Sequence, residues 1–362
     1  WTSHRAETLN FCKACYPFVT DLIRQLGEIV GDRYVVSDDS EKAEFLEERR
    51  GKFNGQGDAV ILPSTVEEVQ RVVRCCASHQ RPIVPQGGNT GLCGGAVSRP
   101  GEVLINLRRL NRILDIDPIN DTMTVQAGCV LANIQQAAIE SGRHFSLSLG
   151  AEGTCQIGGN LSTNAGGINV LRYGNAREQV LGLQAVLPDG RLWNDLTELR
   201  KNNTGYDLKS LLIGAEGTLG IITAAVLKLH PKPQQIETAF VALRDLEASL
   251  ELLTLARAKS GGALSGFELV PQMGVELAER HVPRCSNPLP GDHRWYVIMV
   301  YSGTGLELRT ILENTLASSF EKGTVTDAVI SSSEAQTAQI WGIREGLVEA
   351  QLQEGERYTY DV

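Results

Sequence analysis

The feature that most constrains the fold is a loop at 87–95 in which five of nine residues are glycine. It directly follows an apolar segment at 82–84 that predicts a strand. Without Cβ atoms, a chain can turn sharply, point successive N–H groups at one locus and let an anion approach closely. The loop therefore favours binding of a diphosphate. A flexible surface linker is the alternative, and the position of the loop between two apolar strands argues against it.

Two further glycine clusters follow. The cluster at 150–167 intersperses six glycines with amides and hydroxyls, which offer donors and acceptors to a polar chain and a ring edge. The cluster at 214–222 runs straight into a strand, so its backbone can bond a flat heterocycle. Neither G-x-x-x-x-G-K-[ST] nor a helix-opening G-x-G-x-x-G with a later acid occurs. Separated clusters in one domain thus suggest an extended ligand outside the P-loop and nicotinamide-binding folds.

Length and composition limit the number of domains, the classes of partner and the compartment. The 362 residues, 42% hydrophobic and 21% charged, suffice for two domains with their own cores. A net charge of -9 with scattered cations predicts no nucleic acid partner. No apolar run is long enough to predict a membrane span. Eight sparse cysteines favour a reducing compartment, either cytoplasmic or the mitochondrial matrix.

The hydrophobic pattern divides the chain into three parts and predicts an α+β fold. Residues 1–54 read as a helical, polar segment. Residues 55–232 contain the glycine clusters and end at Pro231 and Pro233, which cannot donate to a strand ladder and make a stiff linker. Residues 233–362 alternate strands with helices, which predicts an antiparallel sheet covered by helices on one face. Strands are expected at 59–62, 82–84, 103–106, 113–116, 123–127, 180–187, 221–229, 239–243, 264–269, 295–301 and 325–329. Helices are expected from Thr65 onward and at 130–141, 245–259, 271–280, 304–320 and 334–353.

The glycine clusters, together with the stretches 126–131, 171–174 and 199–209, resemble the FAD-binding family typified by vanillyl-alcohol oxidase and p-cresol methylhydroxylase. Within it the chain is most similar to D-2-hydroxyglutarate dehydrogenases, and the likeness covers 55–362. The resemblance implies an FAD-binding domain of two α+β subdomains over 55–232 and a substrate or cap domain over 233–362. It implies FAD contacts from Pro85, Gly87, Gly88, Asn89, Thr90, Gly91, Leu92, Gly94, Gly150, Gly153, Thr154, Gly158, Gly159, Asn160, Thr163, Asn164, Gly166, Gly167, Gly174, Glu216, Gly217, Gly220, Ile221 and Ile222.

The resemblance also bears on how FAD is held. Family members that bind flavin covalently through this loop have a histidine after the paired glycines. Asn89 stands at that position here. We therefore expect non-covalent FAD.

The implied reaction is oxidation of a D-2-hydroxyacid, D-2-hydroxyglutarate or D-lactate, to the 2-oxoacid. Hydride leaves C2 for flavin N5, and the site needs a cation for the carboxylate. The sequence from Trp341 to Glu345 resembles the family's W-x-x-R-E, whose arginine grips substrate carboxylate, and this predicts Arg344 as that cation. The alternative is an exposed helix arginine paired with Glu345 or Glu349.

Two departures concern the substrate. The most similar family members carry Thr and Lys at the positions of Val348 and Thr359. A second, distal carboxylate would then lack its cation. This weakens the assignment to a five-carbon diacid and favours D-lactate or another 2-hydroxyacid.

The family continues past the equivalent of Val362 into G-H-x-G-D-G-N-x-H and E-H-G segments, which supply metal ligands and the expected base. Neither occurs here, and the six histidines show no ligand spacing. We therefore expect no metal site within this chain, a divalent metal such as Zn²⁺ only in a full-length form, and further catalytic residues beyond Val362. On this reading the chain lacks about a quarter of the family's length and turns over poorly by itself.

The expected partners are a small 2-hydroxyacid and an electron acceptor such as an electron-transfer flavoprotein or a quinone, with a homodimer as a possibility. Two other functions stay open. One is a truncated flavin-binding remnant without turnover, and the other is a flavoenzyme like alkyl-glycerone-phosphate synthase.

Overall fold

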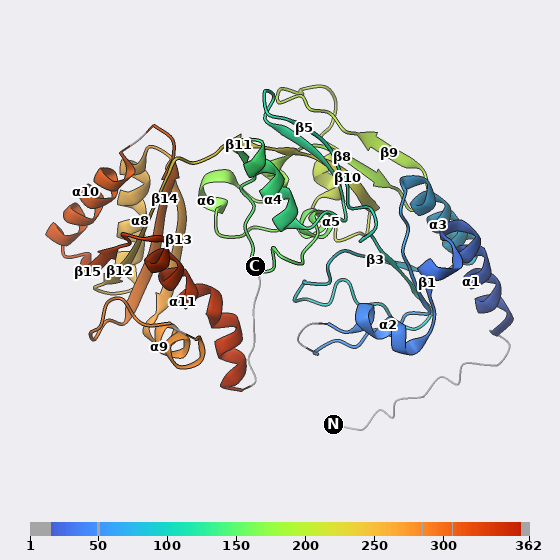
Figure 1. The fold of residues 1–362 in the computed structure, drawn as a ribbon, viewed down its shortest axis with the longest axis horizontal. Helices are drawn as coiled ribbons and strands as arrows, with labels where there is room; N and C mark the ends of the chain where they lie inside the picture. Colours follow the sequence, from blue (N-terminus) through green and yellow to red (C-terminus); the bar gives the residue numbers. More distant parts are fainter. Residues whose placement is uncertain (1–15, 49–50, 284, 306, 356–362) are drawn as a thin grey trace.

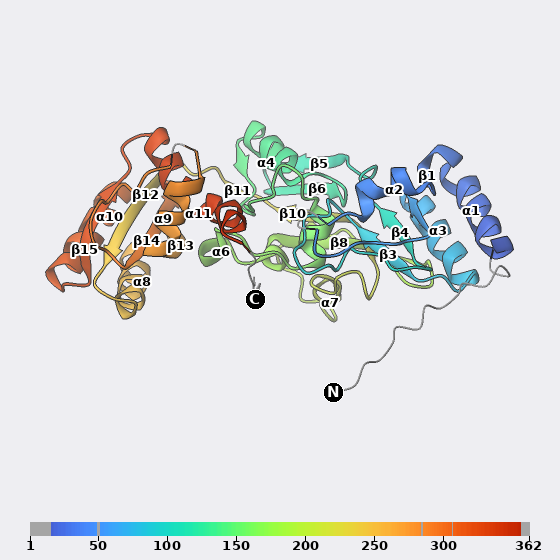
Figure 2. The same ribbon diagram turned by 90° about the horizontal axis from the view of Figure 1, so that it is seen from below.

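The structure is a computed structural model, and it describes residues 16–48, 51–283, 285–305 and 307–355. The molecule is elongated: the chain before 231–233 forms one end and the chain after it the other (Figures 1 and 2). In these described ranges, no helix combines the length and the apolarity that crossing a membrane requires.

The first sheet carries the strand before the glycine-rich loop. Its order is β1-β2-β4-β3, with β2 and β3 each parallel to β4 and β1 antiparallel to β2. The strands are β1 (Val35–Val36), β2 (Ala59–Ile61), β3 (Ile83–Gln86) and β4 (Val103–Asn106). The flanking helices are α1 (Tyr16–Val30), the short 3₁₀ helix η2 (Asp32–Tyr34), α2 (Asp39–Leu46) and α3 (Val66–Ser78).

Helix α3 begins where the sequence predicts. The Thr65 hydroxyl accepts the N–H of Glu68 at 3.1 Å, and the Glu68 carboxylate accepts the N–H of Ser64 at 2.6 Å. The pair is a variant of the capping box, in which the carboxylate at the third helical position accepts the N–H of Ser64, the residue before the N-cap Thr65. The described part of 1–54 is mainly helical, as expected, but it also supplies β1, where Val35 pairs with Ile61 of β2.

The second sheet is antiparallel throughout, in the order β5-β6-β10-β8-β9. Its strands are β5 (Ile113–Asp117), β6 (Thr122–Gln126), β8 (Val180–Val186), β9 (Leu192–Asp195) and β10 (Ile221–Lys228). Shorter elements around it are α4 (Leu131–Glu140), β7 (Arg143–His144), α5 (Ile157–Ser162), α6 (Val170–Tyr173), η3 (Ala176–Gln179), α7 (Lys209–Leu212) and β11 (His230–Pro231). Strands β8 and β9 form a hairpin: Gly190 has a φ of 77°, and the Leu187 N–H donates to the Arg191 carbonyl at 2.9 Å. One apolar cluster joins both sheets, so the two subdomains share a core.

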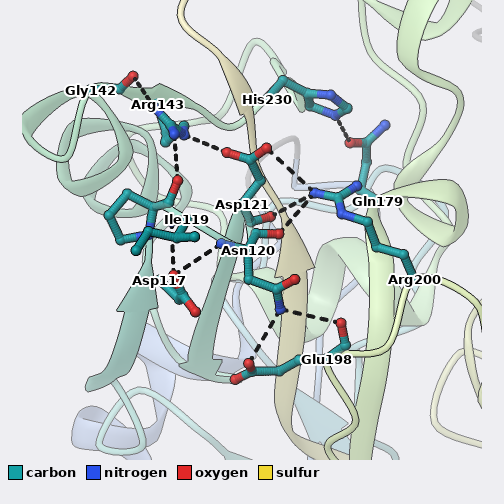
Figure 3. Close-up of polar contacts among 11 residues, drawn as sticks. Asp117, Ile119, Asn120, Asp121, Gly142, Arg143, Gln179, Glu198, Arg200 and His230 are labelled. Carbon is teal, nitrogen blue, oxygen red and sulfur yellow. Dashed lines mark hydrogen bonds and ion pairs between the residues drawn. The ribbon is translucent and has the colours of Figure 1, made fainter.

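A polar cluster ties the β5–β6 turn to its neighbours (Figure 3). Asp117 accepts the N–H of Asn120 at 3.0 Å, and Asp121 has a left-handed φ of 56°. Arg143 of β7 pairs with the Asp121 carboxylate. Arg200, in the segment after β9, donates to the Asn120 carbonyl at 3.1 Å and lies 3.8 Å from the Asp121 carboxylate. The exposed segment after β9 is thereby anchored to the second sheet.

The C-terminal part contains a third, fully antiparallel sheet in the order β13-β14-β12-β15. Its strands are β12 (Gln235–Leu243), β13 (Leu264–Pro271), β14 (Trp295–Gly303) and β15 (Val325–Ile330). Its helices are α8 (Glu247–Ser260), α9 (Gln272–His281), α10 (Leu308–Glu321) and α11 (Glu334–Gln353). All four strands and all four helices overlap the segments expected from the sequence.

The expectation that helices cover only one face of this sheet is wrong. Helices α8 and α10 pack with Val241 and Met299 on one face, whereas α9 and α11 pack with Phe240 and Ile298 on the other (Figure 1). The physical reason lies in the strands: β12 and β14 are buried along nearly their whole apolar stretches, so both faces need a cover.

The junction between the two ends also differs in one detail. Pro231 was expected to lie outside any strand ladder, yet β11 pairs with β7 through His230 with His144 and Pro231 with Arg143. The ladder is only two residues long and has no further neighbour strand, and such an edge tolerates a proline.

Candidate functional site

The structure brings the three glycine clusters together at the end of β3. A Cβ atom at Gly88 would lie 2.2 Å from the carbonyl oxygen of Thr154. A Cβ at Gly87 would lie 3.4 Å from Cβ of Gln156, and one at Gly217 would lie 2.3 Å from Cγ of Pro85. Glycine is therefore required at 88 and 217, because any side chain there would separate segments that the fold packs together.

The loop at 87–95 is held on α2 by side-chain amides. Asn89, with a left-handed φ of 52°, donates its amide to the Glu47 carbonyl at 2.9 Å. Gln86 donates to the Phe45 carbonyl at 2.9 Å, and Asn106 donates to Gln86 Oε1 at 2.9 Å. These contacts give the loop a defined shape. Sequence reasoning did not single out Gln86 and Asn106, because their partners lie far away in the chain.

The start of the loop leaves its main-chain donors unused. Within the described ranges, the N–H groups of Gly88, Asn89, Thr90 and Gly91 donate to no backbone carbonyl. No atom lies within 4 Å of a Cβ built on Gly91, which sits exposed at the tip. Several free N–H groups in one rigid turn form an anion-binding concavity.

Two buried amide oxygens in the second cluster also lack partners. Gln156 Oε1 and Asn160 Oδ1 are enclosed and accept no hydrogen bond from any described residue. Gln156 lies beside Gly87 of the first loop. Because a buried unpaired acceptor is unfavourable, these oxygens point to a ligand that supplies donors at this place. The free N–H groups and the unpaired oxygens together fit a cofactor with a diphosphate and polar ring edges.

The other predicted cofactor residues differ in their surroundings. Open positions, with no atom within 4 Å of a built Cβ, are Gly150, Gly153 and Gly159. Positions that shape the surrounding backbone are Gly94, Gly158, Thr163, Asn164, Gly166, Gly167, Gly174 and Gly220. Glu216 lies close to the first loop, with its carboxylate 3.1 Å from a Cβ built on Gly95, whereas Ile221 and Ile222 are buried at the start of β10. Leu92 lies half-buried in the first loop.

A cavity of about 400 Å³ lies next to Gln156. Its lining comprises Arg108, Asn111, Ile113, Gly128, Cys129, Val130, Asn133 and Gln156. Gly128, Cys129 and Val130 belong to the stretch 126–131 and Gln156 to the second glycine cluster, both of which the sequence singled out. The other lining residues come from the segment after β4, the start of β5 and α4, and no local pattern marks them.

Arg344 lies on α11 and points toward the sheet. Its Nε donates to Glu268 Oε2 of β13 at 2.7 Å, and the two side chains are 39% and 22% exposed. The ion pair that anchors it is thus made across the cap domain with Glu268. It is not made with the helix neighbours Glu345 or Glu349, which were the alternative partners.

Helix α11 is electrostatically coupled to the second glycine cluster. Burial raises the pKa of Glu345, the charge of Glu152 raises it further, and Arg344 lowers it. Glu152 in turn accepts from the amide of Gln135 at 3.1 Å. A direct link across the same boundary is the bond from Arg172 Nη1 to the Ser302 hydroxyl at 3.1 Å. Glu345 of α11 is therefore close to the second glycine cluster, and Arg344 is the preceding residue of the same helix.

Two half-buried histidines, His144 and His230, lie at the junction of the two ends. His230 Nε2 donates to Gln179 Oε1 at 3.1 Å (Figure 3). The His230 ring also packs on Tyr173, with ring centroids 4.6 Å apart. Burial lowers the pKa of His230 to about 4, and the nearby His144 and Arg200 lower it as well. His230 is therefore neutral near pH 7. Among the described residues, no group of three or more His, Cys, Asp or Glu side chains is arranged to hold a metal ion.

The comparisons with known proteins match both ends of the chain. Residues 57–195 match the FAD binding domain, and residues 232–362 match the C-terminal domain of FAD linked oxidases. The chain is 39% identical over 345 residues to the probable mitochondrial D-2-hydroxyglutarate dehydrogenase of Oryza sativa subsp. indica, which covers 95% of this chain and 62% of the relative. It is 38% identical to the mitochondrial D-2-hydroxyglutarate dehydrogenase of Arabidopsis thaliana, covering 92% of this chain and 60% of the relative.

A more distant relative is the D-2-hydroxyglutarate–pyruvate transhydrogenase of Saccharomyces cerevisiae, 32% identical over 89% of this chain and 65% of that protein. The chain thus spans about 60 to 65% of the length of these relatives.

Solved structures confirm the fold. A p-cresol methylhydroxylase structure superimposes with a TM-score of 0.74 at 19% identity, covering 91% of this chain and 69% of that one. An alkyldihydroxyacetonephosphate synthase structure gives a TM-score of 0.70 at 19% identity, covering 92% and 64%. The match of residues 57–195 to the FAD binding domain confirms the expected cofactor, FAD. The chain belongs to the FAD-linked oxidase family, with the family's FAD binding domain followed by its C-terminal domain.

Proposed function

We propose that the protein is an FAD-dependent dehydrogenase that oxidises a D-2-hydroxyacid to the corresponding 2-oxoacid. The observation that carries the proposal is the Arg344 guanidinium on the cap helix α11, anchored at Nε by Glu268, in a chain whose three glycine clusters converge at the end of β3. The names of the relatives, which are D-2-hydroxyglutarate dehydrogenases, support the same substrate class.

The residues that would hold FAD follow from the fit of the site. The free N–H groups at 88–91 suit the diphosphate, and Gln156 Oε1 and Asn160 Oδ1 suit hydrogen-bond donors of the cofactor. When bound, FAD supplies the acceptor for the hydride. The amide of Asn89 is occupied by the Glu47 carbonyl, and an amide offers no nucleophile for a flavin bond, which supports non-covalent binding.

Arg344 would bind the substrate carboxylate. Its guanidinium is anchored through Nε, so the two Nη groups are available for a planar carboxylate partner. By holding C1 of the substrate, Arg344 orients C2 and its hydroxyl relative to the cofactor. This orientation is what a hydride transfer requires, since the reacting atoms must be aligned in near-contact.

The finer assignments remain part of the proposal. We propose an electron-transfer flavoprotein or a quinone as acceptor, and a mitochondrial matrix or cytoplasmic location. The relatives from rice and Arabidopsis carry "mitochondrial" in their names, which supports the former location. A homodimer stays a prediction.

Anaerobic mixing tests the proposal. The purified chain, loaded with FAD, is mixed with D-lactate, D-2-hydroxyglutarate and other D-2-hydroxyacids, with the L-enantiomers as controls. We expect the oxidised flavin band at about 450 nm to bleach with at least one D-enantiomer and with none of the L-enantiomers. Bound flavin that no D-2-hydroxyacid reduces would instead support a flavin-binding remnant without turnover.

A further inference from the structure

The partner of Arg344 has no role in the function proposed so far. Glu268 lies on β13, at the edge of the cap sheet, and its side chain is 22% exposed. It reaches across to α11 and accepts a hydrogen bond from Arg344 Nε at 2.7 Å. These residues are far apart in the sequence, so only the packing of α11 on the sheet brings them together.

This contact determines how the guanidinium is presented. A guanidinium has five N–H donors in one plane, and a carboxylate can grip two of them at once. Glu268 occupies the Nε edge, and no other described residue is recorded as a partner of the Arg344 guanidinium. The Nη1 and Nη2 donors are therefore oriented by Glu268 and left for a ligand carboxylate.

The charges around Arg344 limit how many carboxylates the site accepts. Glu268 already neutralises the guanidinium in part, and Glu345, the next residue on α11, adds a carboxyl group whose pKa is raised by burial and by the charge of Glu152. Val348, one helical turn after Arg344, presents an apolar side chain that is 41% exposed. A second carboxylate on the ligand would enter surroundings that already hold the carboxyl groups of Glu268 and Glu345.

We propose that Glu268 is a positioning and specificity-determining residue, which orients Arg344 for one carboxylate and disfavours ligands that carry a second. The preferred substrate class is then a monocarboxylic D-2-hydroxyacid, such as D-lactate, over a dicarboxylic one. This inference rests on the proposed function and deepens it.

Two substitutions separate orientation from charge. Glu268→Gln keeps an oxygen that accepts from Nε but removes the negative charge, whereas Glu268→Ala removes both. The matched control is Glu237→Gln, in the same sheet: Glu237 pairs with Arg309 at 3.3 Å, and the two side chains are 21% and 43% exposed. Glu237→Gln therefore shows the effect of losing a comparable ion pair elsewhere in the sheet.

The readout is binding of two 2-oxoacids, pyruvate and 2-oxoglutarate, to the FAD-loaded chain. Neither reduces oxidised flavin, and each is followed by the change it causes in the flavin absorption spectrum. We expect wild type to bind pyruvate more tightly than 2-oxoglutarate. Glu268→Gln should shift the ratio of the two dissociation constants toward 2-oxoglutarate by about tenfold, since a nearby unit charge has been removed. Glu268→Ala should bind pyruvate about fivefold or more weakly than Glu268→Gln, because Nε loses its acceptor.

Each outcome either supports or overturns the inference. Equal ratios for Glu268→Gln and Glu237→Gln, or equal pyruvate affinity for both Glu268 variants, overturn the inference while the proposed function stands. If the wild-type flavin spectrum responds to neither 2-oxoacid and no D-2-hydroxyacid bleaches it, both the inference and the proposed function are wrong. Flavin content and far-ultraviolet circular dichroism show whether each variant is folded, and if Glu268→Ala is not, the ratio in Glu268→Gln alone carries the test.

Discussion

Gly88→Ala should impair FAD binding, whereas Gly91→Ala, three residues later, should not. A Cβ at Gly88 would lie 2.2 Å from the Thr154 carbonyl oxygen and 3.0 Å from Cα of Cys155. Both are main-chain atoms, so no side chain can rotate away. Either the first loop or the second glycine cluster has to move. At Gly91 a Cβ meets no atom within 4 Å and the backbone has no left-handed φ.

The magnitude follows from the clash. Forcing an extra carbon into a packed contact costs about 1–3 kcal/mol. If the loop relieves the clash by moving, its free N–H groups lose their positions, and the FAD dissociation constant should rise by about 5- to 150-fold. Gly91→Ala keeps the N–H and should leave the dissociation constant within about twofold of wild type.

The assay is titration of flavin-free protein with FAD, followed by the change in flavin fluorescence, with thermal unfolding measured in parallel. Thermal unfolding reports whether the clash also destabilises the fold. Equal FAD affinity for the Gly88 and Gly91 variants would refute the reasoning. It would mean that the first loop is not packed against 154–155 when FAD is bound.

Three further predictions concern the flavin, the substrate cation and the junction. Acid precipitation should release all flavin into the supernatant, and colour retained in the pellet would show a covalent bond. Arg344→Ala should raise KM for the D-2-hydroxyacid by about 30- to 150-fold, the equivalent of 2–3 kcal/mol, with unchanged flavin content, and Arg344→Lys should restore only part of the loss; an unchanged KM contradicts the assigned role. His230 has a folded-state pKa of about 4, below its ordinary 6.5. Its contribution to stability is therefore complete above pH 6.5 and is lost as pH falls toward 4, where the unfolded chain takes up the proton first. Because the ring is partly exposed, this contribution to the free energy of unfolding is reduced to about 2 kcal/mol. Urea unfolding at pH 7 and pH 4.5 should show a smaller pH dependence for His230→Gln than for wild type, and parallel curves would contradict the assignment.

Much of the fold could be predicted because its signals are local. The capping box at Thr65 and Glu68 depends on residues three apart, and the β8–β9 turn depends on the positive φ that Gly190 accepts. The strands and helices of the cap follow from short apolar stretches. The glycine clusters were likewise visible, since close backbone packing demands glycine wherever it occurs.

The arrangement of the cap was predicted less well, because the covering of a sheet is not a local property. The burial of β12 and β14 on both faces is implied by their continuous apolar runs, yet which helices cover which face depends on the path of the whole chain. Pro231 pairs with Arg143 for a similar reason: a proline can lie in a ladder when its position is at an edge, and the sequence does not show which strands are edges.

The sequence by itself therefore determined the nature of the site: glycines where main chain must approach main chain, and an arginine suited to a carboxylate. Only the tertiary structure decided which residues meet. It placed Glu268 on Arg344 and Asn89 on the Glu47 carbonyl, and it left Gln156 Oε1 enclosed with no donor from the described part of the chain. The physical reason is the separation in sequence over which each interaction acts. Backbone conformation is set by neighbours in the chain, whereas ion pairs and unsatisfied groups are set by contacts between segments that only the packed core brings together.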